Sequence, residues 1–169
     1  MDSLRSDQSP VLHMLCGKIA AGKSTLAADL SRSPQTILIA EDDWLNLLFA
    51  DELVSLPDYV RCSSKLAKIM APHVAALLNA GVSVVLDFPA NTVEQRAWSR
   101  GILEKTTAAH QLHFLDVSDE ACLARLRERN CQGDHPFAVT EAQFRQFSSH
   151  FQAPLLGEGF NVVRHEACG

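Results

Sequence analysis

A nine-residue segment at 17–25, Gly-Lys-Ile-Ala-Ala-Gly-Lys-Ser-Thr, constrains the fold of this chain more than any other feature. It fills every fixed position of the pattern G-x-x-x-x-G-K-[ST]. An apolar run of strand length precedes it at 11–16, and a helix-forming run follows it at 26–30. In a strand, loop and helix of this kind, the loop N–H groups and the helix N-terminus converge on an anion. The segment therefore predicts that the chain binds a nucleoside triphosphate.

We expect the residues of this loop to bind the nucleotide and its metal ion in different ways. Those expected to hold the nucleotide are Gly17, Lys18, Ala20, Ala21, Gly22, Lys23, Ser24 and Thr25. Lys23 can reach the terminal phosphates and act in catalysis, and the Ser24 hydroxyl can ligate the Mg²⁺ that accompanies them. An ordinary glycine turn before a helix is the alternative, but the complete pattern and both flanks favour a phosphate loop. We therefore expect ATP and Mg²⁺ as cofactors.

Length, charge and cysteine usage limit the class of protein. With 169 residues we expect a single domain over 1–169, with 1–10 as a disordered tail. The N-terminus lacks the apolar core of a signal peptide and no stretch is long enough to span a membrane, so we expect no membrane partner. The five cysteines form no C-x-x-C pair, which favours a reducing cytoplasm over a disulfide framework or a zinc site. The net charge of −5 argues against long nucleic acid as a partner.

Apolar runs of strand length alternate with segments of helical period. The expected strands are 11–16, 36–40, 82–87, 111–116 and 160–164. The expected helices are 59–79, 91–107, 118–130 and 140–151, and Pro72 predicts a kink or a break in the first of them. This alternation predicts a doubly wound α/β domain, with a parallel sheet and helices on both faces.

Acidic residues follow two of the expected strands, at the sheet edge where ligands of such folds bind. Asp87 closes an apolar strand, and we expect it to serve the magnesium site, through a metal-bound water rather than directly. Glu41, Asp42 and Asp43 follow the strand at 36–40. One of the two aspartates could simply cap a helix that begins at Trp44. Alternatively, Asp42, with Asp43 as the second candidate, orients the acceptor hydroxyl and takes its proton.

The densest positive cluster is formed by Arg125, Arg127 and Arg129 on one expected helix. Arg125 and Arg129 are four residues apart and share a face. The segment 130–139 reads as a mobile loop, so 125–140 is a candidate lid whose arginines neutralise phosphate charge in catalysis. A solvated helix face, with Arg125 paired to Glu128, is the alternative.

Four segments together resemble the small bacterial P-loop kinases with AAA-type ATP-binding domains, a group that includes chloramphenicol phosphotransferase and the zeta toxins. They are 17–25, 37–42, 84–87 with Arg96, and 125–129. The resemblance implies a five-stranded parallel sheet with a short lid. It also implies Asp42 as base or substrate anchor, Arg125 and Arg129 as phosphate ligands, and Arg96 on the substrate side. The chain departs from this group at Leu45, where many members have an arginine.

These expectations define one main function and its alternatives. The main one is transfer of the γ-phosphoryl group of ATP to a hydroxyl of a small molecule. The apolar stretch 44–49 favours an acceptor with an apolar surface, such as an antibiotic-like compound. The alternatives are a nucleotide-dependent ATPase or switch that acts through a partner protein, and a nucleic-acid end kinase or toxin-type kinase. The sequence leaves the identity of the acceptor and the oligomeric state open.

Overall fold

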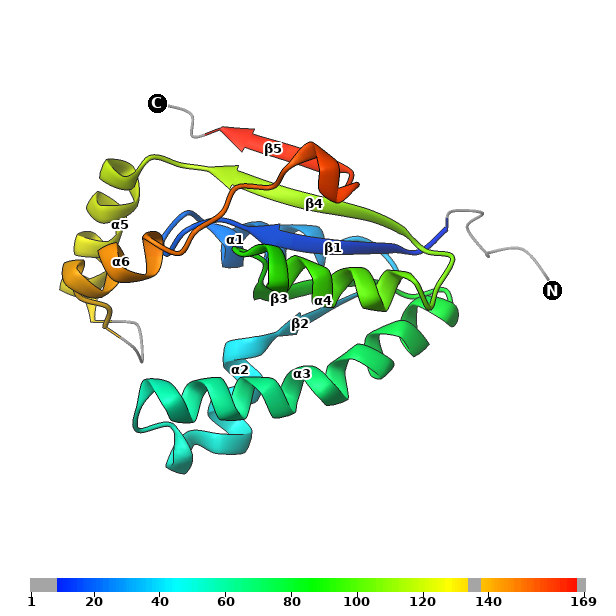
Figure 1. Ribbon diagram of the computed structural model, residues 1–169, viewed down its shortest axis with the longest axis horizontal. Coiled ribbons are helices and arrows are strands. Elements are labelled where there is room, and N and C mark those ends of the chain that lie inside the picture. Colours follow the sequence, from blue (N-terminus) through cyan, green and yellow to red (C-terminus); the bar gives the residue numbers. More distant parts are fainter. Residues whose placement is uncertain (1–8, 134–137, 167–169) are drawn as a thin grey trace.

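A five-stranded, entirely parallel sheet forms the centre of the molecule (Figure 1). The computed structural model describes residues 9–133 and 138–166. The strands are β1 (Val11–Cys16), β2 (Thr36–Ala40), β3 (Ser83–Pro89), β4 (Ala109–Asp116) and β5 (Val162–Glu166). Their order in the sheet is β2-β3-β1-β4-β5. The predicted α/β class, the parallel sheet and all five strands are confirmed.

Helices lie on both faces of this sheet. They are α1 (Lys23–Leu30), α2 (Glu41–Phe49), α3 (Leu56–Asn79), α4 (Val93–Leu103), α5 (Asp119–Gln132) and α6 (Glu141–Ser148), with short 3-10 helices η1 (Ala50–Glu52) and η2 (Leu156–Glu158). Alternate residues of β1 define the two faces, because successive side chains of a strand point to opposite sides. Met14 belongs to the main core with Leu66 of α3, whereas Leu15 packs with Ala27 of α1. Figure 1 shows α3 and α4 on one side of the sheet and α1 on the other.

The longest helix corrects one expectation. α3 runs as one helix over 24 residues with Pro72 inside it, so the predicted break into two helices is wrong. A proline removes one hydrogen bond from a helix interior. Met70 and Val74, on either side of it, are buried in the main core and hold the helix against the sheet. Packing thus offsets the local cost of the proline.

The strand order brings the candidate site together. β3 lies between β2 and β1, so the carboxyl ends of these three strands are neighbours at one edge of the sheet. The phosphate loop leaves β1 at this edge, Glu41 follows β2, and Asp87 lies near the end of β3. No helix in the described part of the chain is long and apolar enough to cross a membrane. The expected tail falls almost wholly on residues 1–8, outside the described residues.

Candidate active site

The phosphate loop joins β1 to α1 through two backbone positions in the left-handed region. Gly22 has φ +101° and Ala20 has φ +61°. A side chain at Gly22 would be strained at that φ, so glycine fits there. Gly17 is needed for another reason: a Cβ atom there would lie 3.2 Å from Cβ of Leu115. The two fixed glycines of the pattern thus serve a backbone turn and a close approach to β4.

The N-terminus of α1 is open. The structure shows no side-chain cap at its N-cap residue, Gly22, whereas Ser55, Thr92, Ser118 and Thr140 cap α3, α4, α5 and α6. The first N–H groups of a helix have no partner within the helix, and they carry a partial positive charge. Those of Lys23, Ser24 and Thr25 are therefore suited to bind phosphate oxygens.

Lys23 folds back over the loop. Its Nζ donates to the carbonyl oxygens of Gly17, at 2.5 Å, and Lys18, at 2.7 Å. Burial lowers the pKa of Lys23, and the negative charges of Asp87 and Asp42 oppose that shift. The Lys18 side chain takes another direction: it forms an ion pair with Asp119. The ammonium group of Lys23 is thus the loop cation closest to the acidic edge of the sheet.

Ser24 and Asp87, the two residues expected to serve a magnesium site, lie within hydrogen-bond distance of each other. The Ser24 Oγ donates to Asp87 Oδ2 at 3.2 Å. The register between β1 and β3 shifts after the pair Met14 and Leu86, so β3 is irregular at Asp87, as strands often are beside functional sites. Burial raises the pKa of Asp87, the hydrogen bond from Ser24 and the charge of Lys23 lower it, and Asp42 and Asp43 raise it further.

This donor set fits Mg²⁺. The ion prefers oxygen ligands and is commonly held by one or two carboxylates together with substrate phosphates. Among the described residues, no group of three or more His, Cys, Asp or Glu side chains could hold a metal by itself. Ser24 and Asp87 would therefore hold the ion only in combination with the phosphates.

The three carboxylates after β2 form the first turn of α2. The helix begins at Glu41 and its N-cap is Ala40, so the expectation that Asp42 or Asp43 caps a helix starting at Trp44 is wrong. Both aspartates are exposed, and they act electrostatically on Asp87. Their negative charge is favourable at a helix N-terminus. The structure thus gathers Asp42, Asp43 and Asp87 around one site beside Lys23.

Glu41 differs from its two neighbours because it points inward. It is buried, and its Oε2 accepts a hydrogen bond from the Tyr59 hydroxyl of α3 at 2.8 Å. Burial raises its pKa to about 7, the hydrogen bond from Tyr59 opposes the shift, and Asp42 and Asp87 add to it. This carboxyl group links α2 to α3.

The three arginines of α5 have separate environments. Arg125 Nη1 donates to the Ala21 carbonyl of the phosphate loop at 3.2 Å. Arg127 instead binds Glu141 of α6, with its Nε 2.6 Å from Oε1. The Nε of Arg129 is buried and has no hydrogen-bond partner among the described residues. Arg125 thus reaches the loop. Part of the expected lid, 134–137, lies outside the described residues.

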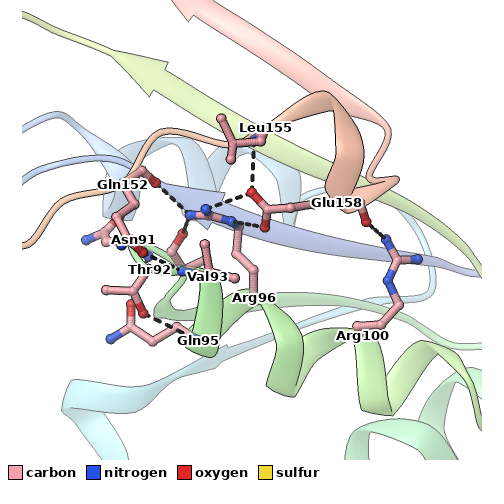
Figure 2. A network of polar contacts seen from close by, with 10 residues as sticks. Asn91, Thr92, Val93, Gln95, Arg96, Arg100, Gln152, Leu155 and Glu158 are labelled. Atoms are coloured by element: carbon pink, nitrogen blue, oxygen red, sulfur yellow. Dashed lines mark hydrogen bonds and ion pairs between the residues drawn. The ribbon is translucent and has the colours of Figure 1, made fainter.

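Arg96 corrects an expectation. Its side chain is fully buried, and the guanidinium group donates to both carboxylate oxygens of Glu158 and to the carbonyl oxygens of Ala90 and Gln152 (Figure 2). With its donors engaged in the protein interior, it cannot serve as the substrate ligand that the resemblance implied. It fastens α4 to the segment before β5.

Asn91 is a residue near the loop that the sequence analysis missed. Its Oδ1 accepts a hydrogen bond from the Gly17 N–H at 2.9 Å. Its position in the sequence could have indicated a role at the site: it lies four residues after Asp87, beyond the same strand and at the same sheet edge. Polar side chains at that edge are candidates whether or not they are charged.

Comparisons with known proteins agree with this fold. The sequence family AAA_33, described as an AAA domain, matches residues 12–154. A search of curated protein sequences gave no match. The fold is similar to that of a protein from Chloroflexus aurantiacus J-10-fl described as a candidate kinase, with a TM-score of 0.73, 20% identity, and coverage of 94% of this chain and 89% of that one.

Two further solved structures share the fold. The APS kinase CysC of Mycobacterium tuberculosis, in complex with AMPPNP and APS, has a TM-score of 0.65 and 18% identity, with 96% of this chain and 91% of that chain covered. A sugar kinase from Janibacter sp. HTCC2649 has a TM-score of 0.63 and 13% identity, with 94% and 85% covered. At such low sequence identity these structural similarities show a shared fold, that of P-loop kinases.

Proposed function

We propose that this chain, which belongs to the AAA_33 family, is a kinase that transfers the γ-phosphoryl group of ATP to a hydroxyl of a small molecule. One observation carries the proposal: the 3.2 Å contact between Ser24 and Asp87, with Lys23 beside it and Asp42 and Asp43 across the sheet edge. A phosphate loop, a magnesium-binding pair and a carboxylate for the acceptor are the parts that phosphoryl transfer requires.

Each part has a role that follows from its chemistry. The open N-terminus of α1 and Lys23 would hold the β- and γ-phosphates, and Ser24 and Asp87 would hold the metal. When bound there, Mg²⁺ would neutralise the negative charge that shifts onto the phosphate oxygens during transfer. Arg125, which touches the loop at Ala21, is placed to add positive charge there.

Asp42 is the proposed group that orients the acceptor hydroxyl and takes its proton, with Asp43 as the second candidate. Both are exposed in the first turn of α2, where an acceptor can reach them. Exposed apolar side chains continue from this turn, among them Trp44, Leu47 and Leu48. They support an acceptor with an apolar surface, such as an antibiotic-like hydroxyl compound.

The test is ATP turnover by the full chain, with and without a library of hydroxyl compounds, scored by phosphate on the product. We expect Lys23→Ala to weaken ATP binding and slow transfer by at least about 100-fold, as loss of a transition-state charge contact does. Asp42→Asn should abolish transfer and keep ATP binding. Asp29→Asn, at the far end of α1, is the matched control and should behave as wild type.

Other results would change or refute the proposal. Transfer that survives Asp42→Asn but not Asp43→Asn would move the base by one residue, and transfer that survives both would remove the carboxylate base. Normal activity of Lys23→Ala would refute the kinase function. Hydrolysis of ATP without transfer to any compound would favour the alternative of an ATPase or switch.

A further inference from the structure

One hydrogen bond connects the end of β3 to the first residue of the phosphate loop. Asn91, two residues after β3 ends, accepts the Gly17 N–H on its Oδ1 at 2.9 Å. We propose that Asn91 is a positioning residue that sets the shape of the phosphate loop before the nucleotide binds. This inference rests on the proposed function, because it concerns the same nucleotide site.

The peptide groups on both sides of Gly17 are held. Its N–H donates to Asn91, and its carbonyl oxygen accepts a hydrogen bond from Lys23 at 2.5 Å. Leu115 approaches so closely that a side chain at Gly17 would have to push it away by a few tenths of an ångström. A rotation of the Gly17 backbone would therefore displace the ammonium group of Lys23. Asn91 prevents that rotation from the other side of the residue.

Asn91 is itself fixed by neighbours that lie outside the loop (Figure 2). Its N–H donates to Gln95 Oε1 at 2.8 Å, and its carbonyl oxygen accepts the Gln152 N–H at 2.8 Å. Gln152 is held in turn, because its own carbonyl oxygen accepts from Arg96 at 2.8 Å. Because the backbone of Asn91 is already fixed, only its side-chain rotamers remain to be ordered when it binds the Gly17 N–H. The loop is thus supported by α4 and by the segment before η2.

Preorganisation makes a measurable difference because a loop that must be ordered at binding loses affinity. Asn91→Leu keeps the size of the side chain and removes the acceptor, which leaves the Gly17 N–H without its partner. We expect ATP to bind this variant about 10-fold more weakly in the presence of Mg²⁺, a difference of about 1.4 kcal/mol. Asn91→Asp keeps an acceptor oxygen at the same place but adds a negative charge near the phosphates, so its ATP affinity should lie between those of Asn91→Leu and wild type.

The experiment is calorimetric titration of the full chain with ATP, with thermal unfolding of each variant measured in parallel. Ser55→Ala is the matched control: it removes the N-cap of α3, where Ser55 accepts the Asp58 N–H at 3.4 Å, and it changes none of the residues named above that hold Asn91. It should lower the melting temperature and leave ATP affinity unchanged. Asn91→Ala serves in place of Asn91→Leu if the leucine variant does not fold.

The outcomes separate this inference from the proposed function. If the wild-type chain binds no ATP, the proposed function fails and this inference fails with it. If the wild type binds ATP and the variants lacking the Asn91 acceptor bind it equally well, only the inference fails. It fails also if Ser55→Ala loses as much affinity, since the loss would then follow stability rather than the loop contact.

Discussion

Replacing Arg96 by alanine should be among the most damaging single changes in the chain. The guanidinium group makes four hydrogen bonds: two to the carboxylate of Glu158, at 2.7 and 2.9 Å, and one each to the carbonyl oxygens of Ala90, at 3.0 Å, and Gln152, at 2.8 Å. The Arg96 side chain is fully buried, and the Glu158 side chain is 13% exposed. The substitution would remove the cation and leave a nearly buried carboxylate behind.

The expected loss of stability follows from the groups that the substitution leaves without a partner. Among the described residues, the Leu155 N–H, at 2.9 Å, would be the one remaining donor to the Glu158 carboxylate. Removal of one partner from a buried ion pair costs about 3–5 kcal/mol, because the remaining charge stays in a poorly solvated place. Domains of this kind have a total stability of about 5–15 kcal/mol. At about 2–4 °C per kcal/mol for a chain of this size, the melting temperature should fall by roughly 6–20 °C.

The assay is urea unfolding followed by circular dichroism, together with thermal melts. Arg61→Ala is the matched control, because Arg61 pairs with Glu52 at 2.8 Å on the surface, with both side chains more than 40% exposed. An exposed pair of this kind contributes about 0–1 kcal/mol. A loss below about 1 kcal/mol for Arg96→Ala, or a loss equal to that of Arg61→Ala, would refute the reasoning that burial makes the Arg96 network strong.

Two further predictions concern the pH dependence of stability, measured by urea unfolding between pH 4 and 8. Burial raises the pKa of Glu41 to about 7 from an ordinary 4.5, so its stabilising contribution is complete below pH 4.5 and is lost as the pH rises to about 7. Glu41→Gln should remove this loss, up to about 3 kcal/mol, and an unchanged profile would contradict the buried acid. The pKa of His113 is shifted in the opposite direction, because burial and the neighbouring His13 and His165 lower it to about 4. Its contribution to stability is therefore complete above pH 6.5 and is lost as the pH falls toward 4. His113→Gln should flatten the acid side of the profile, and a slope as steep as that of wild type would exclude this histidine as the cause.

The strands and most of the helices were predictable because they have local signals. The apolar strands stand out from the sequence, and the capping residues Ser118 and Thr140 mark helix starts that the structure confirms. The failure at Pro72 has a different origin. Whether a proline breaks a helix depends on what the residues around it pack against. Met70 and Val74 are buried in a core that is completed by strands from elsewhere in the chain. A tertiary effect of this kind leaves no local pattern.

The candidate site was predictable as a place but not as a set of contacts. A parallel sheet brings the ends of neighbouring strands to one edge, so Ser24 and Asp87 could be paired from topology alone. Topology does not tell in which direction a side chain at that edge points. Arg96 lies in α4, beside the site. Its guanidinium group points into the interior because the carboxylate of Glu158, 62 residues further along the chain, lies there.

The same reasoning explains why the three consecutive carboxylates after β2 differ. Successive residues of a helix point about 100° apart, so Glu41, Asp42 and Asp43 cannot share one environment. Glu41 faces α3 and finds the Tyr59 hydroxyl, whereas the two aspartates face outward beside Asp87. Buried and exposed carboxylates therefore lie side by side in one turn. Glu41 ties α2 to α3. This contact holds Asp42 and Asp43 at the sheet edge where an acceptor would meet the phosphate loop.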